Sequence, residues 1–290
     1  MLSAMGKTAI LLIGLVFGIV SHASTPPLAP LLEIEGRIYP VDAFPANCKD
    51  LFNGVQCKEA SFGHYHMQAV KEGEVIYSKT EFAAPEGTQV IEQSWEKNGR
   101  VQKAKIENKV LAKTLELEVK NGRAYYRTTD QDGKIKTSDE EAYDNLVVPS
   151  TVMAYVRPHF QELMNDHEVN LHVAVLDRQE AFSFTMSKVK KESHGEILVL
   201  EMVPSSMIVR AFVSRMKFYI NTKTNEFFAF EGRSTLKRKV GDSYRDLDVK
   251  ASYEYKVNQM VPTGTQAAAT SCAADQMFNP VGSKCEVKSE

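Results

Sequence analysis

The chain has 290 residues, of which 43% are hydrophobic and 25% are charged, and its 35 Lys and Arg nearly balance its 37 Asp and Glu. A formal net charge of −2 provides no bulk electrostatic attraction to nucleic acid or to an anionic membrane surface. We therefore expect no nucleic-acid partner. The length is enough for one large β domain or two smaller ones.

The N-terminal segment, residues 1–23, has the pattern of a cleavable secretory signal. Lys7 supplies a positive charge, residues 8–20 are apolar, and Ser21 and Ala23 are small residues at the −3 and −1 positions of a cleavage site. The apolar stretch is shorter than the roughly 20 residues of a membrane-spanning helix. We therefore expect cleavage near Ala23, no stable membrane insertion, and a mature protein that is periplasmic or secreted.

The four cysteines form two close pairs, Cys48 with Cys57 and Cys272 with Cys285. Export permits disulfide bonds, and local pairing is the simplest of the three connectivities. A disulfide that joins the N-terminal segment to the C-terminal tail is the alternative. Because no C-x-x-C spacing occurs and no His lies close to either pair, we expect no metal site and no cofactor.

Changes in composition divide the chain into four segments. Prolines and small residues mark a loose leader after the signal, and a run of small polar residues after Pro262 is typical of a linker. The predicted segments are a signal peptide at 1–23, a leader and Cys48/Cys57 loop at 24–62, a β-rich domain with a central helix at 63–261, and a linker and Cys272/Cys285 tail at 262–290.

Between residues 63 and 261, apolar side chains recur mainly at every second position, most clearly over 247–257. Asn98-Gly99 and Asn121-Gly122 separate such runs, and Asn-Gly is the strongest short hairpin signal. The pattern predicts a mainly β fold built as an antiparallel meander. About a dozen strands do not stay flat, so we expect a barrel-like or strongly curved sheet, with a sandwich as the alternative.

One segment, residues 150–165, has helical spacing instead. Ser150 can cap a helix, and Val152 and Val156 begin an apolar stripe. Pro158 lies inside the segment and lacks the N–H that the helix ladder needs. We predict one inserted helix that bends at this proline.

Two stretches in the second half of the chain have a recognisable pattern. Residues 147–164 read VVPSTVMAYVRPHFQELM, a proline followed by a helix and an aromatic residue three positions before a leucine. Within residues 203–236, a strand begins near Tyr219 and a G-x-S unit is formed by Gly232 and Ser234. Together, over residues 147–236, they resemble a family of uncharacterised exported proteins of proteobacteria. The resemblance implies an envelope protein with a β-rich fold and assigns no catalytic residue.

The aromatic and methionine side chains of the later strands suggest a shared interior. In a barrel wide enough to leave space, such an interior can hold an apolar ligand. An ordinary filled core is the preferred interpretation, because any buried strand face needs aromatic side chains at period two. The candidate ligand-binding residues are Phe182, Phe184, Met202, Phe218, Phe228, Phe230, Tyr253 and Tyr255.

Motifs for enzyme chemistry are absent from the sequence. It contains no G-x-S-x-G elbow and no Gly-rich phosphate loop. His64 and His66 share one face of a predicted strand, but no third metal ligand accompanies them. We interpret the acidic run 139–141 as a solvated turn, and the basic clusters at 188–191 and 237–239 as solvent-facing strand ends.

These patterns favour a non-enzymatic, periplasmic binder of an apolar or envelope-derived, lipid-like ligand. One alternative is a cell-envelope hydrolase whose carboxylate or His catalysts are unassigned. The other is a structural or interaction protein without a small-molecule site. The identity of the ligand and the oligomeric state do not follow from the sequence.

Overall fold

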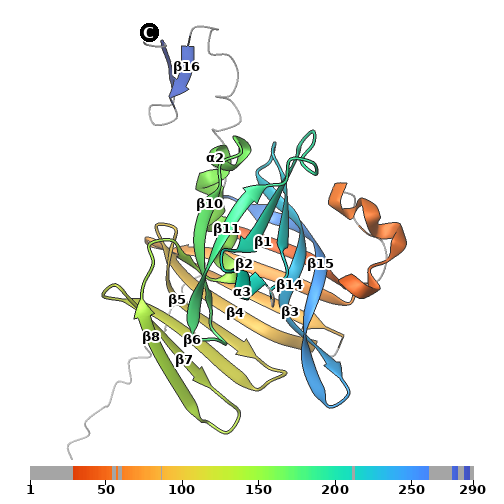
Figure 1. The fold of residues 1–290 in the computed structure, drawn as a ribbon, viewed down its shortest axis with the longest axis vertical. Helices are drawn as coiled ribbons and strands as arrows, with labels where there is room; N and C mark the ends of the chain where they lie inside the picture. The colour runs from red at the N-terminus through yellow and green to blue at the C-terminus, as the bar shows by residue number, and fades with distance from the viewer. Residues whose placement is uncertain are drawn as a thin grey trace, which may run out of the picture.

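Figure 1 shows the computed structural model, which describes residues 29–260 except 54–56, 58–60, 86 and 211–212, and also residues 276–279 and 284–287. Within these residues, fifteen strands form one sheet and two more form a small second sheet. The strands are β1 (Leu32–Pro40), β2 (Gly63–Glu72), β3 (Val75–Ala84), β4 (Gly87–Lys97), β5 (Arg100–Asn108), β6 (Lys113–Lys120), β7 (Arg123–Thr129), β8 (Ile135–Glu141), β9 (Leu146–Val147), β10 (Val169–Val175), β11 (Glu180–Lys188), β12 (Ile197–Pro204), β13 (Met216–Asn221), β14 (Glu226–Val240), β15 (Ser243–Asn258), β16 (Gln276–Asn279) and β17 (Lys284–Val287).

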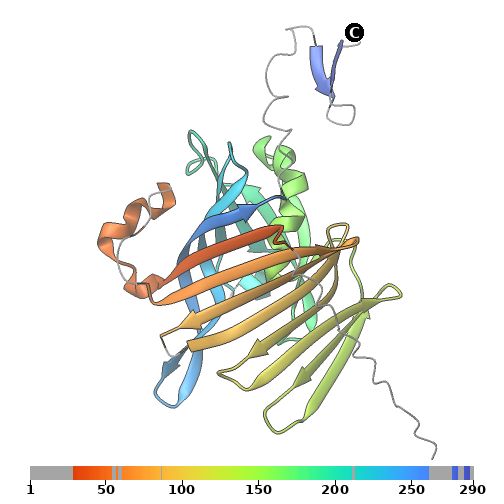
Figure 2. The ribbon, with the colours of Figure 1, turned by 180° about the vertical axis from the view of Figure 1, so that it is seen from behind.

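The large sheet is an antiparallel meander, as the sequence predicted. Its strand order is β8-β7-β6-β5-β4-β3-β2-β1-β15-β14-β13-β12-β11-β10-β9, and among these neighbours only β9 and β10 run parallel. β1 therefore lies between β2 and β15. It joins an N-terminal meander, β2–β8, to a C-terminal meander, β10–β15 (Figure 2).

The central position of β1 corrects the prediction that residues 24–62 form only a leader and a Cys loop outside the domain. Leu32, Ile34 and Ile38 are buried, while the alternate side chains of Glu35 and Arg37 are exposed. This is the period-two pattern of a half-buried strand. The domain thus includes a strand well before residue 63.

The acidic run at residues 139–141 is also not a turn, because it ends strand β8. Asp139 forms an ion pair with Arg123 of β7. Tyr126 donates a hydrogen bond from its hydroxyl to Glu140 Oε1 at 2.6 Å. Charged side chains on a strand near the edge of a sheet discourage pairing with another chain, which accounts for an acidic strand at this place.

The sheet is strongly curved without closing into a continuous ladder. The backbone N–H of Lys237 in β14 donates to Gln89 Oε1 in β4 at 3.3 Å, although four strands separate β14 from β4 in the sheet order. At the opposite ends of the sheet, Ser138 Oγ in β8 donates to the carbonyl oxygen of Gln179 at 2.8 Å. The two meanders therefore face each other across a concave interior (Figures 1 and 2).

A helical segment lies at the place predicted for the inserted helix, and its first part lines the concave interior. It consists of η3 (Pro149–Thr151), α1 (Val152–Val156), η4 (Arg157–His159) and α2 (Phe160–Met164). Pro158 lies in the 3-10 turn between the two α-helical parts, so the helix is split there as expected. Val152, Val156 and Leu163 are buried against residues of β10–β13, which fixes the segment to the C-terminal meander.

The convex face carries a smaller core beneath η1 (Val41–Ala43) and η2 (Ala46–Asn53). Cys48 and Cys57 form a disulfide there, with Cα atoms 4.9 Å apart. They pack with Tyr39 of β1 and Tyr219 of β13. The local pairing predicted for this cysteine pair is therefore present, whereas the predicted pairing of Cys272 with Cys285 lies outside the described residues, as does the predicted signal peptide.

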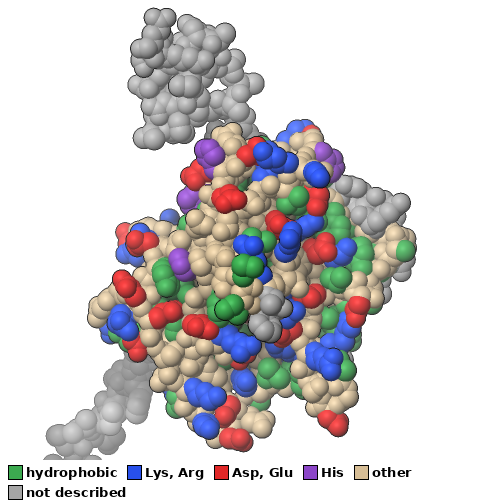
Figure 3. Space-filling model, viewed as in Figure 1, with side chains coloured by type: hydrophobic (Ala, Val, Ile, Leu, Met, Phe, Trp, Pro, Cys, Tyr) green, Lys and Arg blue, Asp and Glu red, His purple; other side chains and the backbone are tan. Residues whose placement is uncertain are grey.

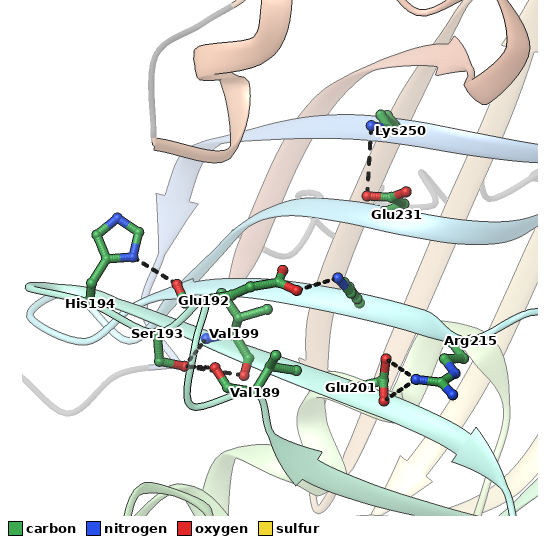
Figure 4. A network of polar contacts seen from close by, with 10 residues as sticks. Val189, Glu192, Ser193, His194, Val199, Glu201, Arg215, Glu231 and Lys250 are labelled. Carbon is green, nitrogen blue, oxygen red and sulfur yellow. Dashed lines mark hydrogen bonds and ion pairs between the residues drawn. The ribbon is translucent and has the colours of Figure 1, made fainter.

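Beyond this core, the outer face of β12–β15 carries paired charges. Figure 3 shows basic and acidic side chains interspersed over the surface. In Figure 4, Lys250 reaches Glu231 at 3.8 Å and Arg215 reaches Glu201 at 3.5 Å. Ion pairs between neighbouring strands thus cover the outside of β12–β15.

The two basic clusters predicted at strand ends are largely neutralised. Lys188 and Lys190 lie 3.4 Å and 2.9 Å from the carboxylate of Asp166. Arg238 makes two hydrogen bonds to the carboxylate of Asp42, at 2.7 and 2.9 Å. These contacts leave little free positive charge to attract an acidic polymer.

Candidate ligand-binding cavity

The concave interior contains a cavity of about 810 Å³. It is lined by both meanders and by the helical segment, and it reaches the surface near exposed Arg178 and Ile208. This volume lies within the range of about 300–1,000 Å³ that is usual for small-molecule sites. The interior is therefore not a completely filled core.

Seven of the eight candidate residues named from the sequence line this cavity, namely Phe182, Phe184, Met202, Phe218, Phe230, Tyr253 and Tyr255. They come from β11, β12, β13, β14 and β15, and they form most of one apolar wall. The Phe218 and Phe230 rings pack edge to face, with centroids 5.3 Å apart.

Phe228 is the exception, because a β-bulge turns it to the convex face. The β13–β14 register shifts between Tyr219 and Ile220, so that Tyr219 faces Ala229 and Ile220 faces Phe227. Phe228 is the extra residue and packs near Tyr219, while Phe227 lines the cavity in its place. A bulge inserts one residue, and strict alternation therefore assigns the wrong face beyond it.

The opposite wall, formed by β3 and β4, combines apolar side chains with the polar side chains of Ser78, Thr80, Glu92 and Glu96, and we call it the polar wall. Glu92 and Glu96 of β4 point into the cavity and are only 3% and 7% exposed, whereas Ile91 and Trp95 occupy the other face of the strand. Thr80 of β3, which is 1% exposed, lies directly opposite Glu92 in the sheet register. The usual alternation of an antiparallel sheet places apolar side chains inward, and β4 departs from it at Glu92, Ser94 and Glu96, which are buried on the inward face.

Three oxygen atoms in this region are buried and have no hydrogen-bond partner among the described residues. They are Glu92 Oε1, Thr80 Oγ1 and Thr235 Oγ1, and all three residues line the cavity. Leaving a buried polar group without a partner costs about 1–3 kcal/mol, and native proteins contain few such groups. The Thr235 hydroxyl still acts on the Glu92 carboxyl as a donor, and the Thr80 hydroxyl acts on Tyr65, but each of the three oxygens keeps the capacity to accept a hydrogen bond from a bound molecule.

The electrostatic environment of the two carboxyl groups disfavours their charged forms. Burial raises the pKa of Glu92 from 4.5 to about 7, and the hydroxyl of Thr235 offsets part of that rise. Burial also raises the pKa of Glu96, while the charge of Arg157 acts in the opposite direction. Glu96 thus has a cation nearby that Glu92 lacks.

Tyrosines connect the polar wall to the apolar wall. The ring of Tyr65 on β2 lies 4.9 Å from that of Tyr253 on β15, which in turn lies 4.7 Å from that of Phe227. The backbone N–H of Phe227 donates to the hydroxyl of Tyr255 at 3.1 Å, and burial raises the pKa of this phenol to about 12. A band of aromatic rings therefore separates the buried carboxyl groups of β4 from the apolar wall.

At the mouth of the cavity, the short helix α3 (Met207–Arg210) presents apolar side chains to solvent. Met207 is 84% exposed and Ile208 is 76% exposed, and Ile208 and Val209 belong to the cavity lining. Exposed apolar residues beside an apolar cavity are typical of an entry site for an apolar molecule. Among the described residues, no helix is long and apolar enough to span a bilayer.

The histidines singled out in the sequence lie outside this cavity. His64 and His66 are on the outer face of β2, where His66 Nε2 lies 3.3 Å from Glu33 Oε1. His172 Nδ1 lies 2.7 Å from Asn145 Oδ1, and its ring stacks on Tyr143. The described part of the chain holds no cluster of three or more metal-ligating side chains.

Sequence reasoning missed Glu92 and the polar wall. A strand with Ile91 and Trp95 on one face and carboxylates on the other suggests that the carboxylates face water. The signal that could have corrected this is the hairpin register, since Glu92 faces Ile106 of β5, a buried residue of the concave side.

Comparison with known proteins found no relative of this chain. No protein-family model, no curated protein and no solved structure matches the chain.

Proposed function

We propose that this protein is a periplasmic, non-enzymatic binder of a lipid-like ligand, which it holds in the concave cavity. The observation that carries the proposal is a cavity of about 810 Å³ with an apolar wall built from β11–β15. Apolar walls with few polar groups are typical of sites that bury most of a small ligand. We propose the periplasm as the location because the sequence predicts export and partly resembles exported envelope proteins.

The cell-envelope hydrolase is the weaker alternative. Glu92 and Glu96 are the two carboxyl groups of the polar wall, and four residues along a strand separate their Cα atoms by about 13 Å. A pair of carboxyl groups that cleaves glycosides lies about 5–9.5 Å apart. The described histidines make no contact with either carboxyl group that would suggest a catalytic pair.

The direct test is to identify what the protein carries. The full chain is expressed with residues 1–23, purified from the periplasm, and its organic extract is analysed by mass spectrometry. We expect a co-purifying lipid in near-stoichiometric amount. A protein that carries no lipid, and that also fails to bind an apolar fluorophore after delipidation, would contradict the proposal.

A matched pair of variants locates the ligand. Ala154 lies on α1 and lines the cavity, so Ala154→Trp places an indole in the ligand space. Gln161 is exposed on α2, so Gln161→Trp adds the same group outside the cavity. We expect the first variant to lose the lipid and the second to retain it.

A further inference from the structure

Three buried oxygens of the cavity can all accept hydrogen bonds, and the two threonine hydroxyls also act as donors, Thr235 toward Glu92 and Thr80 toward Tyr65. Glu92 Oε1, Thr80 Oγ1 and Thr235 Oγ1 come from β4, β3 and β14. Glu92 and Thr80 are directly opposite in the sheet, where paired side chains lie about 4.5–5.5 Å apart at Cβ. The Thr235 hydroxyl is close enough to Glu92 to influence its carboxyl. The oxygens therefore belong to one local cluster.

Glu92 lacks a cation among the described residues. The basic side chains that line the cavity near this wall are engaged elsewhere: Arg233 pairs with Asp248 at 2.5 Å and Lys237 pairs with Asp246. Arg157 acts electrostatically on Glu96. A carboxylate that is 3% exposed and unpaired is strongly disfavoured, and a positive charge delivered by the ligand would remove that penalty.

We propose that the ligand is a cationic amphiphile whose primary ammonium group binds Glu92, Thr80 and Thr235, while its alkyl part lies against the apolar wall. This inference rests on the proposed function and specifies its ligand class. An ammonium group has three N–H donors, which matches three acceptor oxygens, and it provides the charge that Glu92 lacks. The pKa of about 7 that burial gives Glu92 is consistent with a carboxyl group that lacks a cationic partner.

The test compares head groups on one alkyl chain. Delipidated full-length protein is titrated calorimetrically at pH 8 with dodecylamine, dodecanol and dodecanoate, each below its micelle concentration. Hydrogen bonds to a charged group contribute about 1.5–3 kcal/mol, so the amine should bind roughly 10- to 100-fold more tightly than the alcohol. Dodecanoate should bind least tightly, because it would add a second negative charge beside Glu92.

Variants test whether the cluster of Glu92, Thr80 and Thr235 causes the preference for the amine over the alcohol. Glu92→Gln removes the charge at nearly constant volume and should make the amine and the alcohol bind equally. Thr80→Val removes one acceptor without touching the carboxyl and should reduce the preference partially, which provides a test that does not depend on Glu92→Gln folding. Glu118→Gln, at an exposed position on β6, should leave the preference unchanged.

The outcomes separate this inference from the proposed function. If all three compounds bind with equal affinity, or if dodecanoate binds most tightly, the ammonium site is wrong while the apolar cavity stands. If none of them binds the wild-type protein, both proposals fail.

Discussion

At the scale of single residues, Glu92 links the stability of the protein to pH. Burial raises its pKa from 4.5 to about 7, so the folded state binds a proton that the unfolded state has already released between these two values. The folded state is then penalised as pH rises through this window, and the full penalty is present above pH 7. A rise of this size corresponds to at most about 3 kcal/mol.

This gives a prediction for Glu92→Gln in the absence of ligand. The variant should be more stable than the wild type at pH 8, by up to about 3 kcal/mol, and nearly equal to it at pH 4.5, where Glu92 is protonated in the folded protein. Urea denaturation at both pH values measures the difference. Glu118→Gln serves as the surface control, and an equal difference at the two pH values would contradict the linkage.

At the scale of elements, the close packing of β1 against β15 depends on a glycine, Gly36. A Cβ added at Gly36 would lie 2.8 Å from Cδ1 of Tyr253 and 2.9 Å from the carbonyl oxygen of Ser252. Gly36 and Tyr253 face each other in the β1–β15 register, so the ring covers the space that a side chain would fill. Tyr253 also lines the cavity, which connects the central strand to the proposed ligand site.

Gly36→Ala should therefore destabilise the protein by about 1–3 kcal/mol, because the backbone oxygen of β15 cannot move without breaking the ladder. Thermal and urea denaturation measure this change. Glu35→Ala is a suitable control, because Glu35 is an exposed neighbour on the same strand. Unchanged stability of Gly36→Ala would mean that β1 and β15 are not packed this closely.

The stability of the protein should depend on the Cys48–Cys57 disulfide on the convex face. A bond that closes a short loop stabilises a protein by about 2–4 kcal/mol, mainly through the unfolded state. We expect the double variant Cys48→Ala/Cys57→Ala to be less stable by this amount, and reductant to have no further effect at this loop. Peptide mapping without reduction checks the bond itself, and recovery of either residue as a free thiol would count against it.

The elements that the sequence predicted well are those whose ends are fixed locally. The hairpin of β6 and β7 turns at the predicted Asn121-Gly122, because both residues adopt positive φ, of 53° and 73°. The elements that were missed depend on distant partners. β1 is paired with β15, more than 200 residues away, and only that pairing makes it a central strand.

The sequence left the cavity open beside an ordinary filled core, which it favoured, and the structure contains the cavity. Period-two aromatics identified the apolar wall correctly up to the bulge at Phe228. The inward direction of Glu92 depends on registers across β3, β4 and β5 rather than on its own neighbours in sequence. Local periodicity therefore identified the wall that follows the common rule and missed the wall that breaks it.

At the scale of the whole molecule, the cavity lies between the two meanders. The N-terminal meander contributes Thr80 and Glu92, and the C-terminal meander contributes Phe218 and Phe230. A ligand bound in this cavity would contact both meanders, so its binding energy should stabilise them as one unit. Ligand present at 100 times its Kd stabilises the folded state by about 2.7 kcal/mol.

Hydrogen exchange tests this coupling. Saturation with a bound amphiphile should slow amide exchange in β4 and in β13 together, because opening either strand releases the ligand. Ala154→Trp, which fills the cavity, should show no such change on addition of the same compound. Protection confined to one meander would contradict a site shared between the two.

The departure of β4 from the usual alternation has a practical consequence. Trp95, the one tryptophan of the chain, lies on the convex side of the strand that carries Glu92. Its ring is tilted against that of Tyr77, with centroids 5.1 Å apart, and the ammonium group of Lys103 lies over it. The Trp95 indole does not line the cavity, but it belongs to the same strand as Glu92. The tryptophan fluorescence of the unmodified protein should therefore change when β4 moves, without direct quenching by a ligand in the cavity.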